Sequence, residues 1–173
     1  MDMPVVIYGS PVLRKKSYDI EQKYDFHALV ENMFETLKAQ KGIGLAAPQV
    51  GLLKNLFIID TTPLEEEGTG IIEKAYINPE ILSRGAETNY FSEGCLSIPG
   101  IFEEVNRPDK IEVRYRDIHF NWQEQTMEGI ASRIFQHEYD HLQGILFIDH
   151  LHALRKKMLR TKLNKISKGS FKN

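Results

Sequence analysis

The sequence predicts an α+β fold in which small, mainly antiparallel sheets pack around one central helix, with further helices toward the N-terminus and the C-terminus. Three observations lead to this prediction. Three segments place apolar residues at helical spacing, strand-like segments concentrate between the first two of them, and the 173 residues are 42% hydrophobic and 27% charged. That length and composition suit one globular domain with a sizeable core, so we expect residues 1–173 to form a single domain.

The three predicted helices follow from the i, i+3, i+4, i+7 rhythm of their apolar residues. The first covers the segment DFHALVENMFETLKAQKG, with Asp25 as its N-cap and Gly42 as its stop. The second and central one covers residues 127–144 and stops at Gly144. The third is amphipathic and covers residues 152–167. The apolar positions of the first two are Phe26, Leu29, Val30, Met33, Phe34 and Leu37, then Met127, Ile130, Ala131, Ile134 and Phe135.

The strand-like segments lie in the middle of the chain. Residues 56–60 and 71–78 read as strands around the acidic loop TTPLEEEGTG, and residues 111–117 alternate apolar and polar side chains. Between them, residues 80–108 are expected to form short strands broken by Gly and Pro. The segment GIGLAAPQVG is too rich in Gly and Pro to predict a regular element.

Cysteine content and charge indicate where the protein works. Cys95 is the only cysteine, so no intramolecular disulfide can form, and a reducing compartment suits the chain. The first residues lack the long apolar run of a signal peptide or membrane anchor, so we expect a soluble cytoplasmic protein.

Residues 151–173 hold eight Lys and Arg and no Asp or Glu, whereas the rest of the chain is acidic. This asymmetry marks a basic C-terminal helix and tail, and it bears on which partners the protein contacts.

The stretch FQHEYDHLQG, at 135–144, contains an H-E-x-x-H pattern in register with the apolar stripe of the central helix. His137 and His141 are one helical turn apart, so both imidazoles can ligate one ion. Glu138 lies beside them and can deprotonate an attacking water. The alternative is that these are solvated helix residues or hydrogen-bonded core histidines. The pattern favours a metal-binding central helix.

A catalytic metal site needs a third protein ligand and one open position. The metzincin pattern fails because Phe147 stands where its third histidine must be, and no Glu follows His141 to complete a thermolysin-like set. Cys95 is the leading candidate, since a thiolate binds such metals well, although a lone cysteine is often a small buried hydrophobe. The rival ligands are His27, His119, His150 and His152.

Three segments, GIGLAAPQ at 42–49, EGCLS at 93–97 and HEYDH at 137–141, resemble in order and spacing the three signature motifs of the peptide deformylase family. The intervening sequence is similar too, so the resemblance covers essentially the whole chain. It implies a hydrolase that removes the N-formyl group from the initiator methionine of new proteins and releases formate. The family usually works with Fe²⁺, and Zn²⁺ or Ni²⁺ often occupies the purified protein.

The resemblance also implies roles for individual residues. Cys95, His137 and His141 would hold the metal, and Glu138 would serve as general base and acid. Gln49 and the backbone N–H of Leu96 would stabilise the developing oxyanion. An extended peptide would pair with the backbone of Ile43, Gly44 and Gly94, and the methionine side chain would enter a pocket lined by Ile43, Ile130 and Ile134. Arg107 matches a family arginine that we expect to pair with Asp140.

The partners follow from these expectations. We expect nascent formylmethionyl peptides as substrates and no DNA or membrane partner. The basic C-terminal helix could contact ribosomal RNA, the alternative being an ordinary solvated face. Two other functions stay open: an H-E-x-x-H endopeptidase, and a non-catalytic protein with a closed structural metal site. A less active relative of the family is a third reading, although Gln49, Leu96 and Glu138 are intact.

Overall fold

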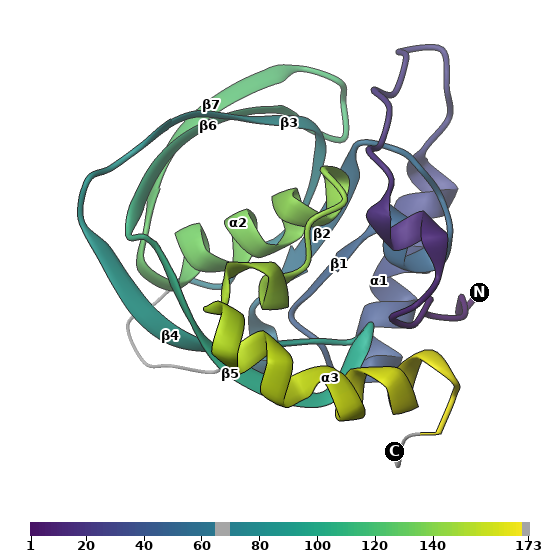
Figure 1. The fold of residues 1–173 in the computed structure, drawn as a ribbon. Coiled ribbons are helices and arrows are strands. Elements are labelled where there is room, and N and C mark those ends of the chain that lie inside the picture. Colours follow the sequence, from purple (N-terminus) through teal and green to yellow (C-terminus); the bar gives the residue numbers. More distant parts are fainter. Residues whose placement is uncertain (65–69, 171–173) are drawn as a thin grey trace.

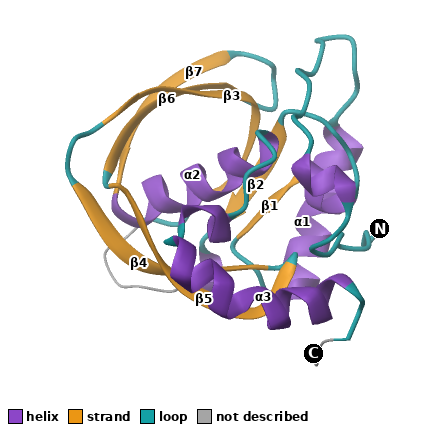
Figure 2. Ribbon diagram, in the orientation of Figure 1, coloured by secondary structure: helices purple, strands orange, loops and turns teal. Residues whose placement is uncertain are grey.

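The computed structural model describes residues 1–64 and 70–170. The acidic part of the predicted loop, at 65–69, and the end of the basic tail, at 171–173, lie outside the described residues. A curved sheet and a two-stranded ribbon enclose a central helix, and two further helices lie outside them (Figures 1 and 2). The predicted α+β architecture is confirmed.

The larger sheet has five strands in the order β1-β2-β3-β6-β7, and every neighbouring pair is antiparallel. Its strands are β1 (Gly44–Ala46), β2 (Leu56–Asp60), β3 (Glu73–Arg84), β6 (Lys110–Arg116) and β7 (Trp122–Glu128). The ribbon consists of β4 (Thr88–Cys95) and β5 (Ile98–Pro108). The β4–β5 register shifts between Glu93 and Cys95, so an irregularity adjoins the cysteine.

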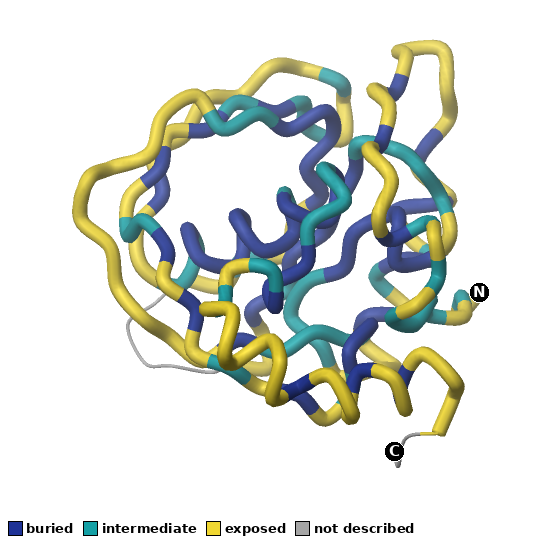
Figure 3. The backbone as a smooth tube through the Cα atoms, in the orientation of Figure 1, coloured by how far each residue is buried: buried dark blue, intermediate teal, exposed yellow. Residues whose placement is uncertain are grey.

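The three helices are α1 (His27–Gln40), α2 (Gly129–Leu142) and α3 (Ala153–Ser167), and they match the predicted segments. Helix α2 is the central one, and its trace is buried along almost its whole length (Figure 3). Helix α3 packs only Leu159, Leu163 and Ile166 into a core cluster that includes Ile98 and Ile101 of β5. Short 3₁₀ turns occur at Pro11–Arg14, Ala47–Val50, Thr62–Leu64 and Phe147–His150. No helix in the described part of the chain combines the length and apolar character needed to traverse a bilayer.

The strand predictions need four corrections. Residues 88–108 form one long hairpin rather than short strands. Its pairing runs from Thr88–Pro108 to Glu93–Glu103 and resumes at Cys95–Ile98, and Pro99 and Gly100, with φ 77°, lie in the irregular stretch between. Strand β3 continues to Arg84, past Pro79. GIGLAAPQVG contains the three-residue strand β1 and a 3₁₀ turn. Strand β7 was not predicted, because all of its residues except Met127 are exposed and no apolar alternation marks it.

The observed helix ends agree only in part with those predicted from the sequence. The predicted N-cap, Asp25, is wrong: the N-cap of α1 is Phe26, and the Asp25 carboxylate instead accepts the His27 backbone N–H at 3.1 Å. Helix α1 ends at Gln40, and its left-handed C-cap is Lys41 with φ 55°, one residue before the predicted stop at Gly42. Gly144 has φ 74° just after α2, as predicted for a C-terminal stop. A Cβ there would lie 2.7 Å from the Arg14 carbonyl oxygen, which only glycine avoids.

Candidate active site

Cys95, His137 and His141 meet although they come from two distant segments of the chain. The end of β4 carries the cysteine, and α2 carries both histidines one turn apart. One ligand atom from each residue lies within 4.8 Å of the others, and Cys95 Sγ is 3.3 Å from His141 Nε2. These three residues are the one potential metal-binding group of this kind found within residues 1–64 and 70–170.

The donor set fits a divalent transition metal. Bond lengths of about 2.3 Å to sulfur and 2.0–2.1 Å to nitrogen at a tetrahedral angle place such ligands roughly 3.6 Å apart, close to the observed Sγ–Nε2 distance. Burial would raise the pKa of the Cys95 thiol, but the charge of His141 and hydrogen bonds from both imidazoles lower it to about 5. The cysteine is therefore a thiolate at neutral pH, the form that binds metal.

Glu138 lies beside the three candidate metal ligands, and Gly44 leaves room for its carboxylate. Glu138 is buried, and its Oε2 atom has no hydrogen-bond partner among the residues that the structure describes. A Cβ on Gly44 of β1 would lie 2.4 Å from Glu138 Oε1, so only glycine allows the carboxylate this position. Burial raises the pKa of Glu138 to about 7, against the opposing effect of the two imidazoles. Such a carboxylate can both take and return a proton near neutral pH.

Gln49 presents an oriented amide donor to the same space. Its Oε1 accepts the Ala46 backbone N–H at 2.9 Å, which holds the amide in one orientation. Its Nε2 then donates to Cys95 Sγ at 3.4 Å and to Ser97 Oγ at 3.1 Å. The side chain is buried at the end of the 3₁₀ turn after β1, so the donor is positioned before any substrate arrives.

Glu93, to which no sequence pattern gave a role, also contacts one of the candidate metal ligands. Its Oε1 lies 2.9 Å from His137 Nδ1, and a ligating histidine needs such a partner on its other nitrogen to fix ring orientation. Arg107 and Arg133 each donate to Glu93 at 2.7 Å, and all three side chains are buried. Burial alone would raise the pKa of Glu93, but these hydrogen bonds and charges lower it. Strand alternation was the available signal, since Glu93 and Cys95 are two residues apart.

The ion-pair network continues to the far side of α2. Arg107 also donates to Asp140 Oδ2 at 2.9 Å, which confirms the predicted pair. His150 Nε2 lies 2.7 Å from the same oxygen, so a residue considered only as a rival ligand instead supports this pair. His27 lies at an exposed site beside Asp25 and the Ile118 carbonyl, away from the metal-ligand group.

A cleft of about 1330 Å³ opens above the site. The residues predicted to bind substrate all line it, together with the catalytic candidates: Ile43, Gly44, Gly94, Ile130 and Ile134, then Gln49, Leu96 and Glu138. Cys95 and His137 also line the cleft, whereas His141 is buried and is not a lining residue. The cleft thus brings the three sequence motifs to one place.

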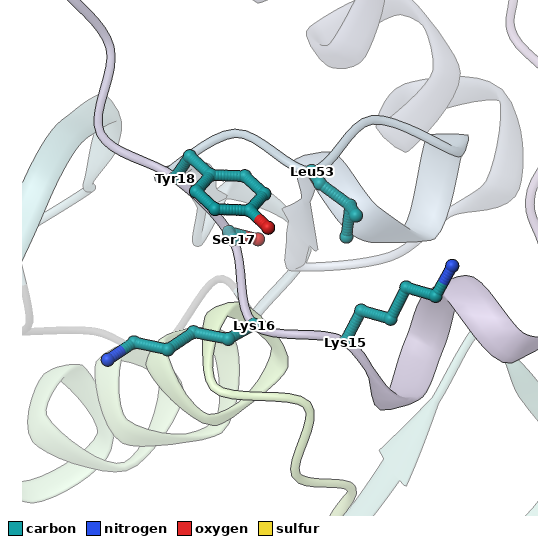
Figure 4. Close-up of a pocket in the computed structure, with 5 residues that line it drawn as sticks. All are labelled: Lys15, Lys16, Ser17, Tyr18 and Leu53. Carbon is teal, nitrogen blue, oxygen red and sulfur yellow. The ribbon is translucent and has the colours of Figure 1, made fainter.

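A second, open hollow of about 510 Å³ lies on the N-terminal arm (Figure 4). It is lined by Lys15, Lys16, Ser17, Tyr18 and Leu53, and its two lysine side chains extend in opposite directions (Figure 4). Its lining includes no carboxylate, histidine or cysteine. The cleft over Glu138 is therefore the candidate active site.

Comparisons with known proteins agree with this geometry. A family model described as "Polypeptide deformylase" matches residues 2–157. The peptide deformylase of Cytophaga hutchinsonii is 42% identical over 170 residues, covering 98% of this chain and 92% of that one. The peptide deformylase of Thermotoga neapolitana is 40% identical and covers 96% and 97%. The crystal structure of peptide deformylase from Thermus thermophilus superposes with a TM-score of 0.87 at 38% identity, covering 98% and 99%. The chain belongs to the polypeptide deformylase family.

Proposed function

We propose that this chain is a metal-dependent amide hydrolase that removes the N-formyl group from the N-terminal formylmethionine of newly synthesised proteins and releases formate. One observation supports this most directly. A thiolate and two imidazoles converge at a cleft, and beside them lies a buried carboxylate whose Oε2 atom has no partner in the described part of the chain. We further propose that residues 1–173 act as one catalytic domain, since α3 packs onto β5.

In this proposal Cys95, His137 and His141 hold one divalent cation. When bound, the cation polarises the formyl carbonyl and makes water acidic enough to act as a nucleophile near neutral pH. A Cys/His/His set accepts several divalent ions. We propose Fe²⁺ as the native one, because it is the ion that the family usually uses, with Zn²⁺ or Ni²⁺ able to replace it after purification.

Glu138 performs both proton transfers. Its free Oε2 atom is the acceptor for the proton of the attacking water. The same carboxyl then delivers that proton to the departing amine, which is a poor leaving group without it. A pKa of about 7 suits both steps, because the carboxyl must release what it takes within one turnover.

Gln49 and Leu96 stabilise the negative oxygen of the tetrahedral intermediate. The amide of Gln49 is held by Ala46 and directed toward Cys95, so it needs little reorganisation when charge develops. The backbone N–H of Leu96, directly after the cysteine, is the second donor. Loss of one such donor typically costs on the order of 10²–10³ in rate.

Substrate binds as an extended strand in the cleft. We propose that its backbone pairs with Ile43 and Gly44 on one side and Gly94 on the other, because main-chain bonds tolerate almost any sequence. Ile130 and Ile134 of α2, with Ile43, then line the pocket for the methionine side chain. These apolar residues suit an unbranched thioether side chain.

The basic face of α3 supplies a second contact in this proposal. Its lysines and arginines lie outside the core and after the last acidic residue of the chain. We propose that they bind ribosomal RNA electrostatically in the cytoplasm, where nascent substrates emerge.

Formate release from formyl-Met-Ala-Ser by anaerobically purified, iron-loaded protein tests the proposed function. We expect turnover that is lost in Glu138→Ala while the metal content is retained. Cleavage of an internal bond in an N-terminally blocked peptide would instead identify an endopeptidase. Retained metal without turnover on either peptide would identify a closed structural site.

A further inference from the structure

Phe102 is a large apolar side chain that the fold leaves in water at the mouth of the cleft. It is 71% exposed, whereas the residue before it in β5, Ile101, is buried against the cluster beneath α3. Both residues lie in the irregular part of β5, between the pairs Glu93–Glu103 and Cys95–Ile98, and there Phe102 lines the cleft while Ile101 packs into the core. Exposed aromatic groups at a binding cleft commonly mark a contact surface.

The backbone of β4 fixes where the Phe102 ring lies. A Cβ on Gly94 would be 2.5 Å from the Cε1 atom of Phe102, so the ring rests directly over this glycine. Gly94 immediately precedes Cys95. The ring is therefore held next to the backbone that, in the proposed function, pairs with the substrate.

Phe91 of β4, the strand that also carries Gly94, adds a second exposed aromatic ring. It is 53% exposed and also lines the cleft. Its ring centroid lies 5.7 Å from the guanidinium carbon of Arg133, which is itself bound to Glu93. Gly94 supports the ring of Phe102 and Arg133 supports the ring of Phe91, while the other side of each ring is exposed. This is the arrangement of a preformed contact surface. We call Phe91 and Phe102 the aromatic rim.

We propose that the aromatic rim makes the enzyme prefer apolar side chains directly after formylmethionine. This inference rests on the proposed function. In an extended peptide, the methionine side chain enters the apolar pocket and the next side chain points to the other face. Phe102 is exposed on β5 and packs over Gly94, the residue before Cys95, so it is placed for the second residue. Phe91, farther along β4, is placed for the residues beyond.

The test compares formyl-Met-Phe-Ser with formyl-Met-Ser-Ser, with formyl-Met-Ala-Ser as the common reference. We expect the metal-loaded wild-type protein to have a KM about 3- to 10-fold lower for the phenylalanine peptide, as for one aromatic pair, with similar kcat. Phe102→Ser should bring the two KM values together and leave kcat nearly unchanged. Phe102→Leu should keep most of the preference, because the side chain stays apolar.

Tyr90 provides the matched control. It precedes Phe91 in β4, is 60% exposed and does not line the cleft. Tyr90→Ser removes another exposed aromatic ring from the same hairpin, and we expect it to leave the preference intact.

Three results would overturn the inference. Equal KM values for the two peptides in the wild-type protein would show that the rim contacts no substrate side chain. An equal loss of kcat on all peptides in Phe102→Ser would mean that the ring only supports Gly94. A concentration-dependent dimer in light scattering that Phe102→Ser abolishes would assign the rim to a second copy of this chain. Failure of the wild-type protein on formyl-Met-Ala-Ser would instead refute the proposed function.

Discussion

Helices α2 and α3 have nearly the same length, 14 and 15 residues, but they relate to the rest of the molecule in opposite ways. Helix α2 buries charged and polar side chains along with apolar ones, and most of them have specific partners. Helix α3 buries only three apolar residues, and its charged side chains lie outside the core, with Arg155 paired to Glu103 of β5. A charge that is buried and paired is costly to disturb, whereas a solvated one is not. The same kind of substitution should therefore have very different effects in the two regions.

The largest effect is expected at Glu138 of α2. Glu138→Gln keeps the size of the side chain but removes its ability to accept and return a proton. We expect kcat to fall by about 10²–10⁴ with little change in metal content. Formate release and metal analysis on the same preparation measure both. Near-normal kcat would refute the assigned role.

The next largest effect is expected at Glu93, which we compare with a second glutamate that pairs with an arginine. Glu93→Gln leaves buried Arg107 and Arg133 without their carboxylate and weakens the contact to His137. We expect metal affinity to fall by about 10- to 100-fold and the free energy of unfolding to fall by about 3–5 kcal/mol. Competition with a chelator and denaturant unfolding measure the two quantities.

The matched control is Glu103→Gln, which breaks the pair between Glu103 and Arg155 of α3. The Glu103 side chain is only 11% exposed, but Arg155 is 47% exposed and can be solvated when its partner is lost. We therefore expect metal affinity to be unchanged and the loss of stability to be clearly smaller than in Glu93→Gln. Similar losses in both variants would mean that burial does not distinguish the two pairs.

A smaller effect concerns stability in acid. Burial would raise the pKa of Asp140, but hydrogen bonds from His150 and Arg107 lower it below its usual 3.8. A lowered folded-state pKa means that the stabilisation is complete above the unfolded pKa and disappears as the pH falls through the folded one. We expect Asp140→Asn to flatten the fall in unfolding free energy below about pH 4. Denaturant unfolding between about pH 3 and 7 measures it, with exposed Glu104→Gln as a control that keeps the wild-type slope.

The smallest effect on chemistry is expected from the charges of α3. Lys156, Lys157 and Arg160 are exposed, and reversing them to Glu leaves the apolar side of the helix in place. We expect kcat/KM on formyl-Met-Ala-Ser within about twofold of the wild type, while salt-sensitive ribosome binding is lost. Cosedimentation at two salt concentrations tests this. Unchanged binding would leave α3 as a solvated face.

Local patterns predicted the helices better than the strands. The stripe from Ile130 to Phe135 predicted α2 because a helix repeats within its own sequence. Strand β7 was not predicted, because only Met127 is buried and its strand conformation comes from pairing with β6. Asp25 looked like a cap from its residue type, yet the chain began its helix one residue later. For β7 the missing information was the pairing with another strand, whereas for Asp25 it was a local choice, because its carboxylate bonds to His27 without capping the helix.

The sequence by itself determined that two imidazoles lie one turn apart on a helix with a carboxylate beside them, because that spacing depends only on helix geometry. It also narrowed the third ligand to Cys95 or one of four histidines, with the cysteine favoured. Tertiary structure alone decided that Cys95 comes within 3.3 Å of His141 and that Glu93, two residues earlier, reaches His137. It also raised the pKa of Glu138 to about 7 by burial. Distance and burial between segments more than forty residues apart depend on how the whole chain packs, and no local pattern encodes them.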